Sequence, residues 1–222
     1  MTRIGEEIEK FRSLLPQGTE LVAVSKFHPA ESIAEAYAAG QRVFGESRVQ
    51  ELLQKIPLLP SDIRWHFIGH LQTNKVRQII GKTALIESVD SEKLLDLIDS
   101  ESRRAGTTTG VLMQLHVAEE ETKFGFTPEE LLDYFSSRKF ENLTNTHIYG
   151  VMGMASNTSD QNRIRADFAA IAATAGRIRQ ICPDLRGFDT ISMGMSGDWA
   201  IAIEEGSTLV RVGTAIFGNR NY

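Results

Sequence analysis

Eight short runs of apolar and β-branched residues recur along this chain of 222 residues and alternate with helical patterns. They cover residues 21–24, 42–44, 65–68, 84–89, 110–117, 148–151, 190–192 and 208–212. Parallel strands need long crossover connections, which helices supply, so the alternation predicts an α/β fold with a parallel sheet. Eight such units fit a closed (β/α)8 barrel, the TIM barrel, near its lower size limit of about 200 residues. An open doubly wound sheet has the same periodicity and remains the alternative.

The segments between these runs carry apolar residues at helical spacing. One such segment extends from Phe168 to Ile178, and Thr127, followed by a proline and two acids, marks the start of another helix. An additional helix over residues 3–15 is predicted before the first strand. Because no stretch rich in Pro, Gly or Ser separates two blocks, residues 1–222 are predicted to form a single domain.

Charge and cysteine content exclude several classes of protein. The 24 basic and 29 acidic residues give a formal charge of −5, which argues against nucleic acid or an anionic membrane as the main partner. No apolar run reaches the roughly 18 residues of a membrane span, and the charged N-terminus does not resemble a signal peptide. A lone cysteine, Cys182, suits a reducing compartment, so we expect the cytoplasm. No metal site is predicted, because His66 and His70 bracket a strand end.

In a barrel of this type, functional residues gather where strands end. Lys26 directly follows the first apolar run, so its amine is expected at the mouth of the barrel. Partial desolvation there would lower the pKa of the amine and favour a neutral nucleophile. A lysine that extends from the strand end into water is an equally good interpretation of this residue alone.

The loops after the last two runs have the composition of an anion site. They span residues 192–198 and 211–218 and combine glycines with hydroxyl side chains. Exposed backbone N–H groups at the start of a helix bind anions, and barrel enzymes often bind phosphate after strands seven and eight. Closure places strand eight beside strand one, so Arg211 is expected near Lys26. A lysine, an arginine and a phosphate site together suit a phosphorylated aldehyde, of which pyridoxal 5′-phosphate (PLP) is the commonest cofactor.

Seven segments in order from about residue 20 onward resemble the YggS/PROSC family of pyridoxal phosphate homeostasis proteins. They read VAVSK at 22–26, FGESRVQE at 44–51, WHFIGHLQTNK at 65–75, KFGF at 123–126, GVMGM at 150–154, SMGMSGD at 192–198 and RVGTAIFG at 211–218. The resemblance implies a barrel similar to the N-terminal domain of alanine racemase, and a cytoplasmic protein that binds, buffers and delivers PLP without an established reaction. Its expected partners are PLP and apo PLP-dependent enzymes.

The resemblance also implies roles for single residues. Lys26 matches the Schiff-base lysine, and Arg211 matches the arginine that faces the pyridine nitrogen. The complete set of implied cofactor-binding residues is Lys26, Met152, Ser192, Met193, Gly194, Arg211, Gly213 and Thr214. No catalytic residue is carried over. Ser47 departs from the asparagine that the family commonly has after Phe-Gly-Glu, so that residue's contact is not carried over. Lys123 is a further candidate amine for PLP transfer, or else an exposed loop lysine.

Two enzyme hypotheses compete with a carrier. A PLP-dependent amino-acid racemase would use the same barrel, but the resemblance implies that its second base, a tyrosine, comes from a C-terminal β domain. The chain ends at Tyr222, soon after the last loop, which favours the carrier and a monomer. An arginine opposite the pyridine nitrogen also disfavours protonation of the ring and weakens it as an electron sink. A barrel enzyme acting on a phosphorylated sugar is the third hypothesis, and it would be colourless.

Overall fold

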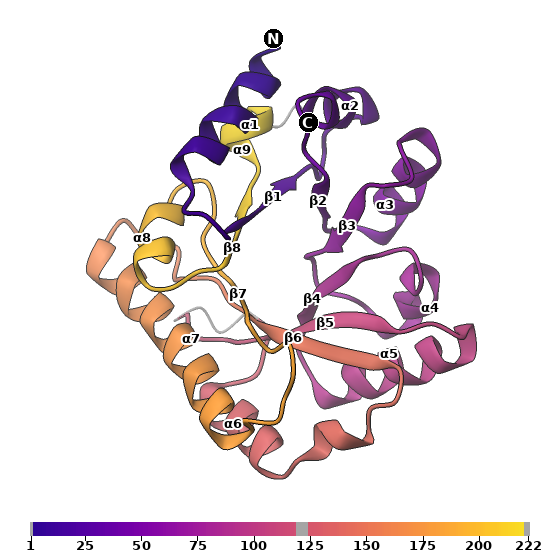
Figure 1. Ribbon diagram of the computed structural model, residues 1–222, viewed down its shortest axis with the longest axis vertical. Helices are drawn as coiled ribbons and strands as arrows, with labels where there is room; N and C mark the ends of the chain where they lie inside the picture. The colour runs from indigo at the N-terminus through magenta and orange to yellow at the C-terminus, as the bar shows by residue number, and fades with distance from the viewer. Residues whose placement is uncertain (1, 119–123, 220–222) are drawn as a thin grey trace.

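Eight parallel strands pair side by side in chain order, and the last pairs with the first (Figure 1). The computed structural model describes residues 2–118 and 124–219. The strands are β1 (Glu20–Val24), β2 (Val43–Glu46), β3 (Arg64–Phe67), β4 (Leu85–Val89), β5 (Thr109–Gln114), β6 (Thr146–Met152), β7 (Thr190–Ser192) and β8 (Leu209–Val212). The closed barrel predicted from the sequence is confirmed, and the open sheet is excluded.

Helices surround the strands (Figure 1). They are α1 (Arg3–Leu14), α2 (Ala30–Ala38), α3 (Val49–Lys55), α4 (Val76–Ile79), α5 (Glu92–Ala105), α6 (Pro128–Ser136), α7 (Gln161–Ile181), α8 (Trp199–Glu204) and α9 (Thr214–Phe217), with short 3-10 turns at Ile56–Leu58, Thr73–Lys75 and Lys139–Asn142. The predicted N-terminal helix is present as α1, and Thr127 caps α6 in a capping box. Within the described residues, no helix is long and apolar enough to cross a membrane.

The fifth strand is shorter than its apolar run predicts. The run extends over residues 110–117, whereas β5 ends at Gln114. Beyond that point the backbone pairs with a returning segment: the His116 N–H donates to the Phe126 carbonyl, and the Phe126 N–H donates to the Gln114 carbonyl, both at 2.8 Å. The apolar residues past the end of β5, Leu115 and Val117, pack against the core without extending the strand.

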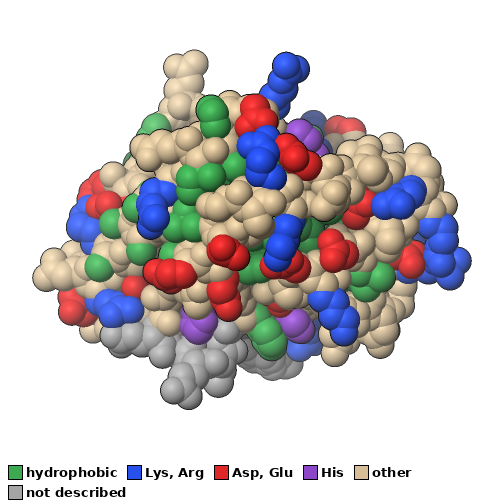
Figure 2. Space-filling view, turned by 90° about the horizontal axis from the view of Figure 1, so that it is seen from below, with side chains coloured by type: hydrophobic (Ala, Val, Ile, Leu, Met, Phe, Trp, Pro, Cys, Tyr) green, Lys and Arg blue, Asp and Glu red, His purple; other side chains and the backbone are tan. Residues whose placement is uncertain are grey.

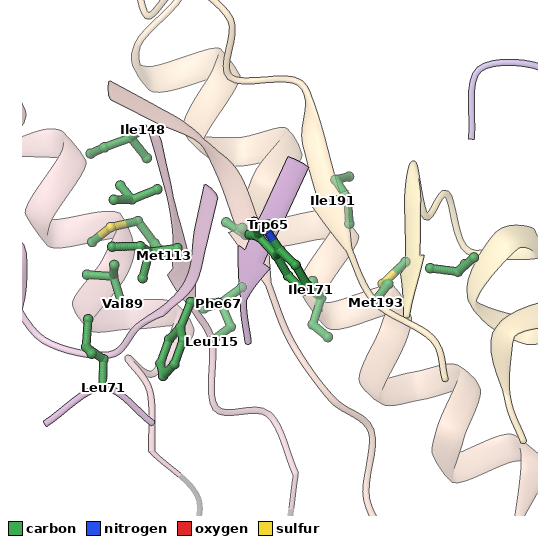
Figure 3. Close-up of a cluster of buried hydrophobic side chains, with 14 of the residues drawn as sticks. Trp65, Phe67, Leu71, Val89, Met113, Leu115, Ile148, Ile171, Ile191 and Met193 are labelled. Carbon is green, nitrogen blue, oxygen red and sulfur yellow. The ribbon is translucent and has the colours of Figure 1, made fainter. Parts of the chain in front are cut away.

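The apolar core has an outer layer and an inner one. The outer layer lies between strands and helices and includes Trp65, Ile171 and Met193 (Figure 3). The inner layer fills the barrel with small clusters, one of which contains Val22, Val24, Val43 and Leu209. Alternate residues of each strand thus face the two layers, as the two-residue period of a strand requires.

The seam that closes the barrel joins early and late parts of the chain. β1 pairs with β8 over four residues, from Glu20 opposite Leu209 to Ala23 opposite Val212. Helix α1 packs against α2 and α9 beside this seam (Figure 1). The seam brings the residues just after β1 close to the residues that end and follow β8.

On the face shown in Figure 2, Lys and Arg side chains lie among Asp and Glu side chains.

Candidate functional site

A cavity of about 320 Å³ lies at the carboxyl ends of the strands on both sides of this seam. Its volume is at the lower end of the range of small-molecule sites, about 300–1,000 Å³. The residues that line it are Val24, Lys26, Ile68, Met152, Met154, Met195, Ser196, Gly197, Arg211, Gly213 and Thr214. Five of the eight residues predicted to bind a cofactor are therefore together in one cavity.

Lys26 is placed by a tight turn that follows β1. The His28 N–H donates to the Ser25 carbonyl at 3.0 Å, and Phe27 has a positive φ of 68°. The ring of His28 stacks on Phe217 of α9, with 5.1 Å between the ring centroids. Lys26 itself is half-buried and lines the cavity.

Arg211 also lines the cavity, and it is only 4% exposed. Its guanidinium donates to the Gly153 carbonyl at 2.9 Å and to the hydroxyl of Ser192. Ser192 in turn donates to Oε2 of Glu87 at 2.6 Å, and Nδ1 of His66 lies 2.7 Å from Oε1 of the same carboxylate. A connected polar network inside the barrel thus holds the arginine.

Glu87 is fully buried at the centre of this network. Burial by itself raises the pKa of its carboxyl, but the hydrogen bond from His66, the charge of Arg211 and the hydroxyl of Ser192 outweigh burial and lower that pKa. Glu87 is therefore an ionised partner for Arg211, with 3.7 Å between its Oε2 and the guanidinium. The charge of the Arg211 guanidinium is thus balanced by the buried carboxylate of Glu87.

Hydrogen-bond donors converge at another part of the cavity, where α9 begins. The Gly213 N–H, the Ala215 N–H and the Thr214 hydroxyl all point to Oγ of Ser196, at 3.3, 3.5 and 3.4 Å. An anionic oxygen close to this position would receive the same donors. Helix α9 spans only four residues, so its dipole is small. An anion at this position would be held mainly by hydrogen bonds from these three donors.

Three predicted residues do not line the cavity. Ser192 ends β7 and contacts Arg211 from inside the barrel, whereas Met193 is fully buried in the outer core (Figure 3). Gly194 has a positive φ of 93°, and a Cβ there would lie 2.6 Å from Cβ of Ala202, so it is a close-packed turn residue. Ser196 of the same loop reaches the cavity instead. In the sequence, the signal that favours Ser196 is that a glycine, Gly197, follows it directly.

The sequence analysis singled out two other residues, Ser47 and Lys123. Ser47 packs its backbone against Gly69, where a Cβ would meet the Ser47 carbonyl oxygen at 2.3 Å. Ser47 is not among the described residues that line the cavity. Lys123 lies outside the described residues.

Comparison with known proteins identifies the family. The alanine racemase N-terminal domain model matches residues 1–221. The pyridoxal phosphate homeostasis protein of Aquifex aeolicus is 37% identical over 231 residues, covering all of this chain and 97% of that protein. The human protein of the same name is 38% identical, covering 91% of this chain and 77% of its own length. The chain belongs to the family of pyridoxal phosphate homeostasis proteins. The resemblance inferred from the motifs is confirmed.

Solved structures agree with this family assignment. PipY of Synechococcus elongatus PCC7942, solved without PLP, is 38% identical and superposes with a TM-score of 0.92 over 97% of this chain and all of that one. A second structure of PipY has PLP bound and a TM-score of 0.88. Alanine racemase from E. faecalis is 20% identical, with a TM-score of 0.72, and this chain covers 58% of it. That likeness shows the fold alone.

Proposed function

We propose that this homeostasis protein binds PLP in the cavity as a Schiff base on Lys26, and that it buffers and delivers PLP without catalysing a reaction. One observation carries the proposal: Lys26, Arg211 and the donors around Thr214 line a single cavity. PLP has three matching groups, an aldehyde, a pyridine nitrogen and a phosphate. The PLP-bound structure of PipY, a relative of 38% identity, supports the same ligand class.

Each group of the ligand has a candidate partner. The amine of Lys26 would hold the aldehyde carbon, and Arg211 would face the pyridine nitrogen. Gly213, Thr214 and Ala215 would donate to the phosphate, with Met152 beside the ring. Ser192 would act indirectly in this arrangement, by holding Arg211. Met193 and Gly194 would shape the loop that presents Ser196.

The side chains around the cavity favour a carrier over a racemase. A Schiff base forms from an amine and an aldehyde with loss of water, and water or a second amine breaks it, so release needs no oxidant or reductant. Racemisation needs a proton acceptor on each face of the α-carbon. Among the described residues that line the cavity, Lys26 and Arg211 carry the ionisable side chains, and Arg211 stays protonated, so the lining offers one candidate acceptor and not two.

The attachment site is tested by absorption and mapping. The purified protein with PLP should absorb near roughly 420 nm, as protonated PLP imines do. Borohydride reduction and peptide mapping should place the pyridoxyl group on Lys26, and Lys26→Ala should lose the band. An adduct found only on other residues would refute the assignment.

Delivery and catalysis are separated by a paired assay. We expect the PLP-loaded protein to restore activity to an apo-transaminase. Incubation with L-alanine in deuterated water should give no racemisation at a meaningful rate. Rapid deuterium exchange with stereo-inversion, abolished in Lys26→Ala, would favour the racemase instead.

We further propose a cytoplasmic monomer that serves apo PLP-dependent enzymes. The closed barrel supports a monomer, because within the part of the chain that the structure describes each strand pairs on both sides and offers no edge for a second chain to extend. The lone cysteine, Cys182, is buried, which suits a reducing compartment.

A further inference from the structure

A buried ion cluster lies behind the strand end that carries Lys26. Lys55, the last residue of α3, is 6% exposed, and its ammonium reaches back to the barrel. It donates to Oε1 of Glu46 and to Oε1 of Glu51, both at 2.6 Å, and to the Ser25 carbonyl at 2.9 Å. All three N–H groups of the ammonium are thereby used.

The cluster contacts the residues on both sides of Lys26. Before it, the Ser25 carbonyl accepts from Lys55, and the Ser25 hydroxyl donates to Glu46 at 2.6 Å. After it, the Phe27 N–H donates to Oε1 of Glu51 at 2.6 Å. The backbone that flanks Lys26 is therefore tied at two points to the same three charged side chains.

One of those points is a strained residue. Phe27 has a φ of 68°, a left-handed conformation that bulky side chains rarely adopt. Such a conformation persists only where the surroundings impose it, and it is common at functional sites. Here the Glu51 carboxylate holds the N–H of Phe27, and the Arg48 guanidinium lies 4.7 Å from the centroid of its ring.

The cluster acts on the cavity from outside. Glu46, Glu51 and Lys55 are not among the described residues that line the cavity. A buried ion pair is weak evidence of a contribution to stability, since apolar residues of similar volume often serve as well. The contacts of this cluster hold the backbone on both sides of Lys26 where the chain leaves β1. They thereby set the position of the Lys26 Cα atom and the direction of its side chain.

We propose that Lys55, Glu46 and Glu51 are positioning residues that preset the backbone around Lys26, so that its amine is held ready to attack an aldehyde in the cavity. This inference rests on the proposed function, because it assumes that Lys26 is the attachment residue. The amine nitrogen bonds to the aldehyde carbon, the carbon–oxygen bond breaks, and the aldehyde oxygen leaves as water with the two amine protons, with no change of oxidation state. The cluster supplies orientation and touches neither reactant.

The test separates covalent attachment from non-covalent binding. PLP is added to the apo protein and the rate of Schiff-base formation is followed near roughly 420 nm. Pyridoxine 5′-phosphate, which has the ring and phosphate but no aldehyde, reports non-covalent affinity by equilibrium titration. In Glu51→Leu, which removes the acceptor for the Phe27 N–H, we expect the rate to fall at least about tenfold and the affinity for pyridoxine 5′-phosphate to stay within about twofold.

Two further variants sharpen the result. Glu51→Gln keeps an oxygen acceptor for Phe27 and should restore most of the rate. Asp99→Leu is the matched control: Asp99 is also buried and accepts backbone N–H groups, from Thr144 and Asn145, but at the amino end of the barrel. It should leave the rate of attachment unchanged.

Three outcomes would overturn the inference. Equal losses of rate and of pyridoxine 5′-phosphate affinity in Glu51→Leu would make the cluster a general support of the fold. An unchanged rate would remove it from the attachment step, and a loss of rate in Glu51→Gln as large as in Glu51→Leu would show that the acceptor is not what matters. By contrast, a wild-type protein with no adduct on Lys26 would refute the proposed function itself.

Discussion

At the scale of single residues, the two ends of the cavity differ in the charge of the groups that their donors contact. The carboxylate of Glu87 balances the charge of Arg211, so Arg211 offers a ligand directed hydrogen-bond donors with little net charge. The donors around Thr214, by contrast, point to the neutral hydroxyl of Ser196. Charge-assisted hydrogen bonds to phosphate should therefore form at the α9 end. This division predicts which substitutions affect affinity and which affect stability.

Thr214→Val should weaken PLP binding. The substitution keeps the shape but removes a hydroxyl donor to the phosphate, and one charge-assisted hydrogen bond contributes about 1.5–3 kcal/mol, or roughly one to two decades of affinity. Equilibrium titration measures the change, and Thr83→Val, in the loop after α4, is the control that should bind normally. Unchanged affinity in Thr214→Val would mean that the phosphate lies elsewhere.

Glu87→Gln should mainly reduce stability. It leaves the buried Arg211 without its counter-charge, and breaking a buried pair in this way costs about 3–5 kcal/mol. Denaturant unfolding measures the loss. Glu92→Gln, which breaks the exposed pair with Lys139, is the control and should leave the unfolding midpoint unchanged. A Glu87→Gln protein as stable as the wild type would show that Glu87 does not balance Arg211.

The same carboxylate predicts a dependence of stability on pH. The pKa of Glu87 is lower in the folded protein than its ordinary value of 4.5. Its contribution is therefore complete above pH 4.5 and is lost as the pH falls through the lower folded pKa. Unfolding free energy measured from pH 7 downwards should fall less steeply in Glu87→Gln than in the wild type. Parallel slopes would contradict the shifted pKa.

Strand ends in the sequence predicted much of this site. Lys26 and Arg211 follow from closure of the barrel, since strands one and eight must be neighbours. The loop after β7 was harder, because a three-residue strand leaves the direction of Ser192 and Ser196 undetermined until the turn at Gly194 is known. The partner of His66 was also beyond the sequence, because the apolar pattern does not show that the side chain of Glu87, on the neighbouring strand β4, meets His66.

At the scale of elements, the strands depend on close approach at a few positions. Gly150 of β6 lies opposite Thr190 of β7, with a φ of 153°, and a Cβ there would lie 1.8 Å from the Thr190 carbonyl oxygen. The sequence predicted both strands from their apolar runs. It did not predict this contact, because strand periodicity carries no information on the spacing between neighbouring backbones.

Gly150→Ala should destabilise the protein by at least about 2 kcal/mol, since the added methyl forces β6 and β7 apart and strains the backbone. Gly176→Ala is the matched control. Gly176 lies within α7 and a Cβ there meets no atom within 4 Å, so alanine should add about 0.5–1 kcal/mol through its helix propensity. Urea denaturation of both variants checks the pair. A Gly150→Ala protein of wild-type stability would mean that the two strands separate without cost.

At the scale of the whole molecule, ligand binding and barrel closure are linked. The cavity takes Lys26 from one side of the β1–β8 seam and Arg211 from the other, so a ligand that contacts both stabilises the closed state. The sequence favoured the closed barrel because eight β/α units fit it, although the same periodicity left an open sheet as the alternative.

PLP should therefore raise the melting temperature. At a free concentration of 100 times Kd, binding to the folded state alone adds about 2.7 kcal/mol, which corresponds to roughly 5–11 °C for a chain of this size. Calorimetry with and without PLP measures the shift, and pyridoxal, which lacks the phosphate, should give a smaller one. Equal shifts for the two ligands would show that the phosphate donors contribute nothing.

The seam between β1 and β8 also sets when a nascent chain acquires its function. Lys26 leaves the ribosome well before Arg211 and Thr214, because it precedes both of them along the chain. At about 5–20 residues per second, the roughly 185 residues between Lys26 and Arg211 take about 10–40 s to translate. No ribosome-bound fragment has a complete cavity during that interval. The reactive aldehyde of the vitamin B6 cofactor would then be captured in this site only by chains in which β8 has been made and paired with β1.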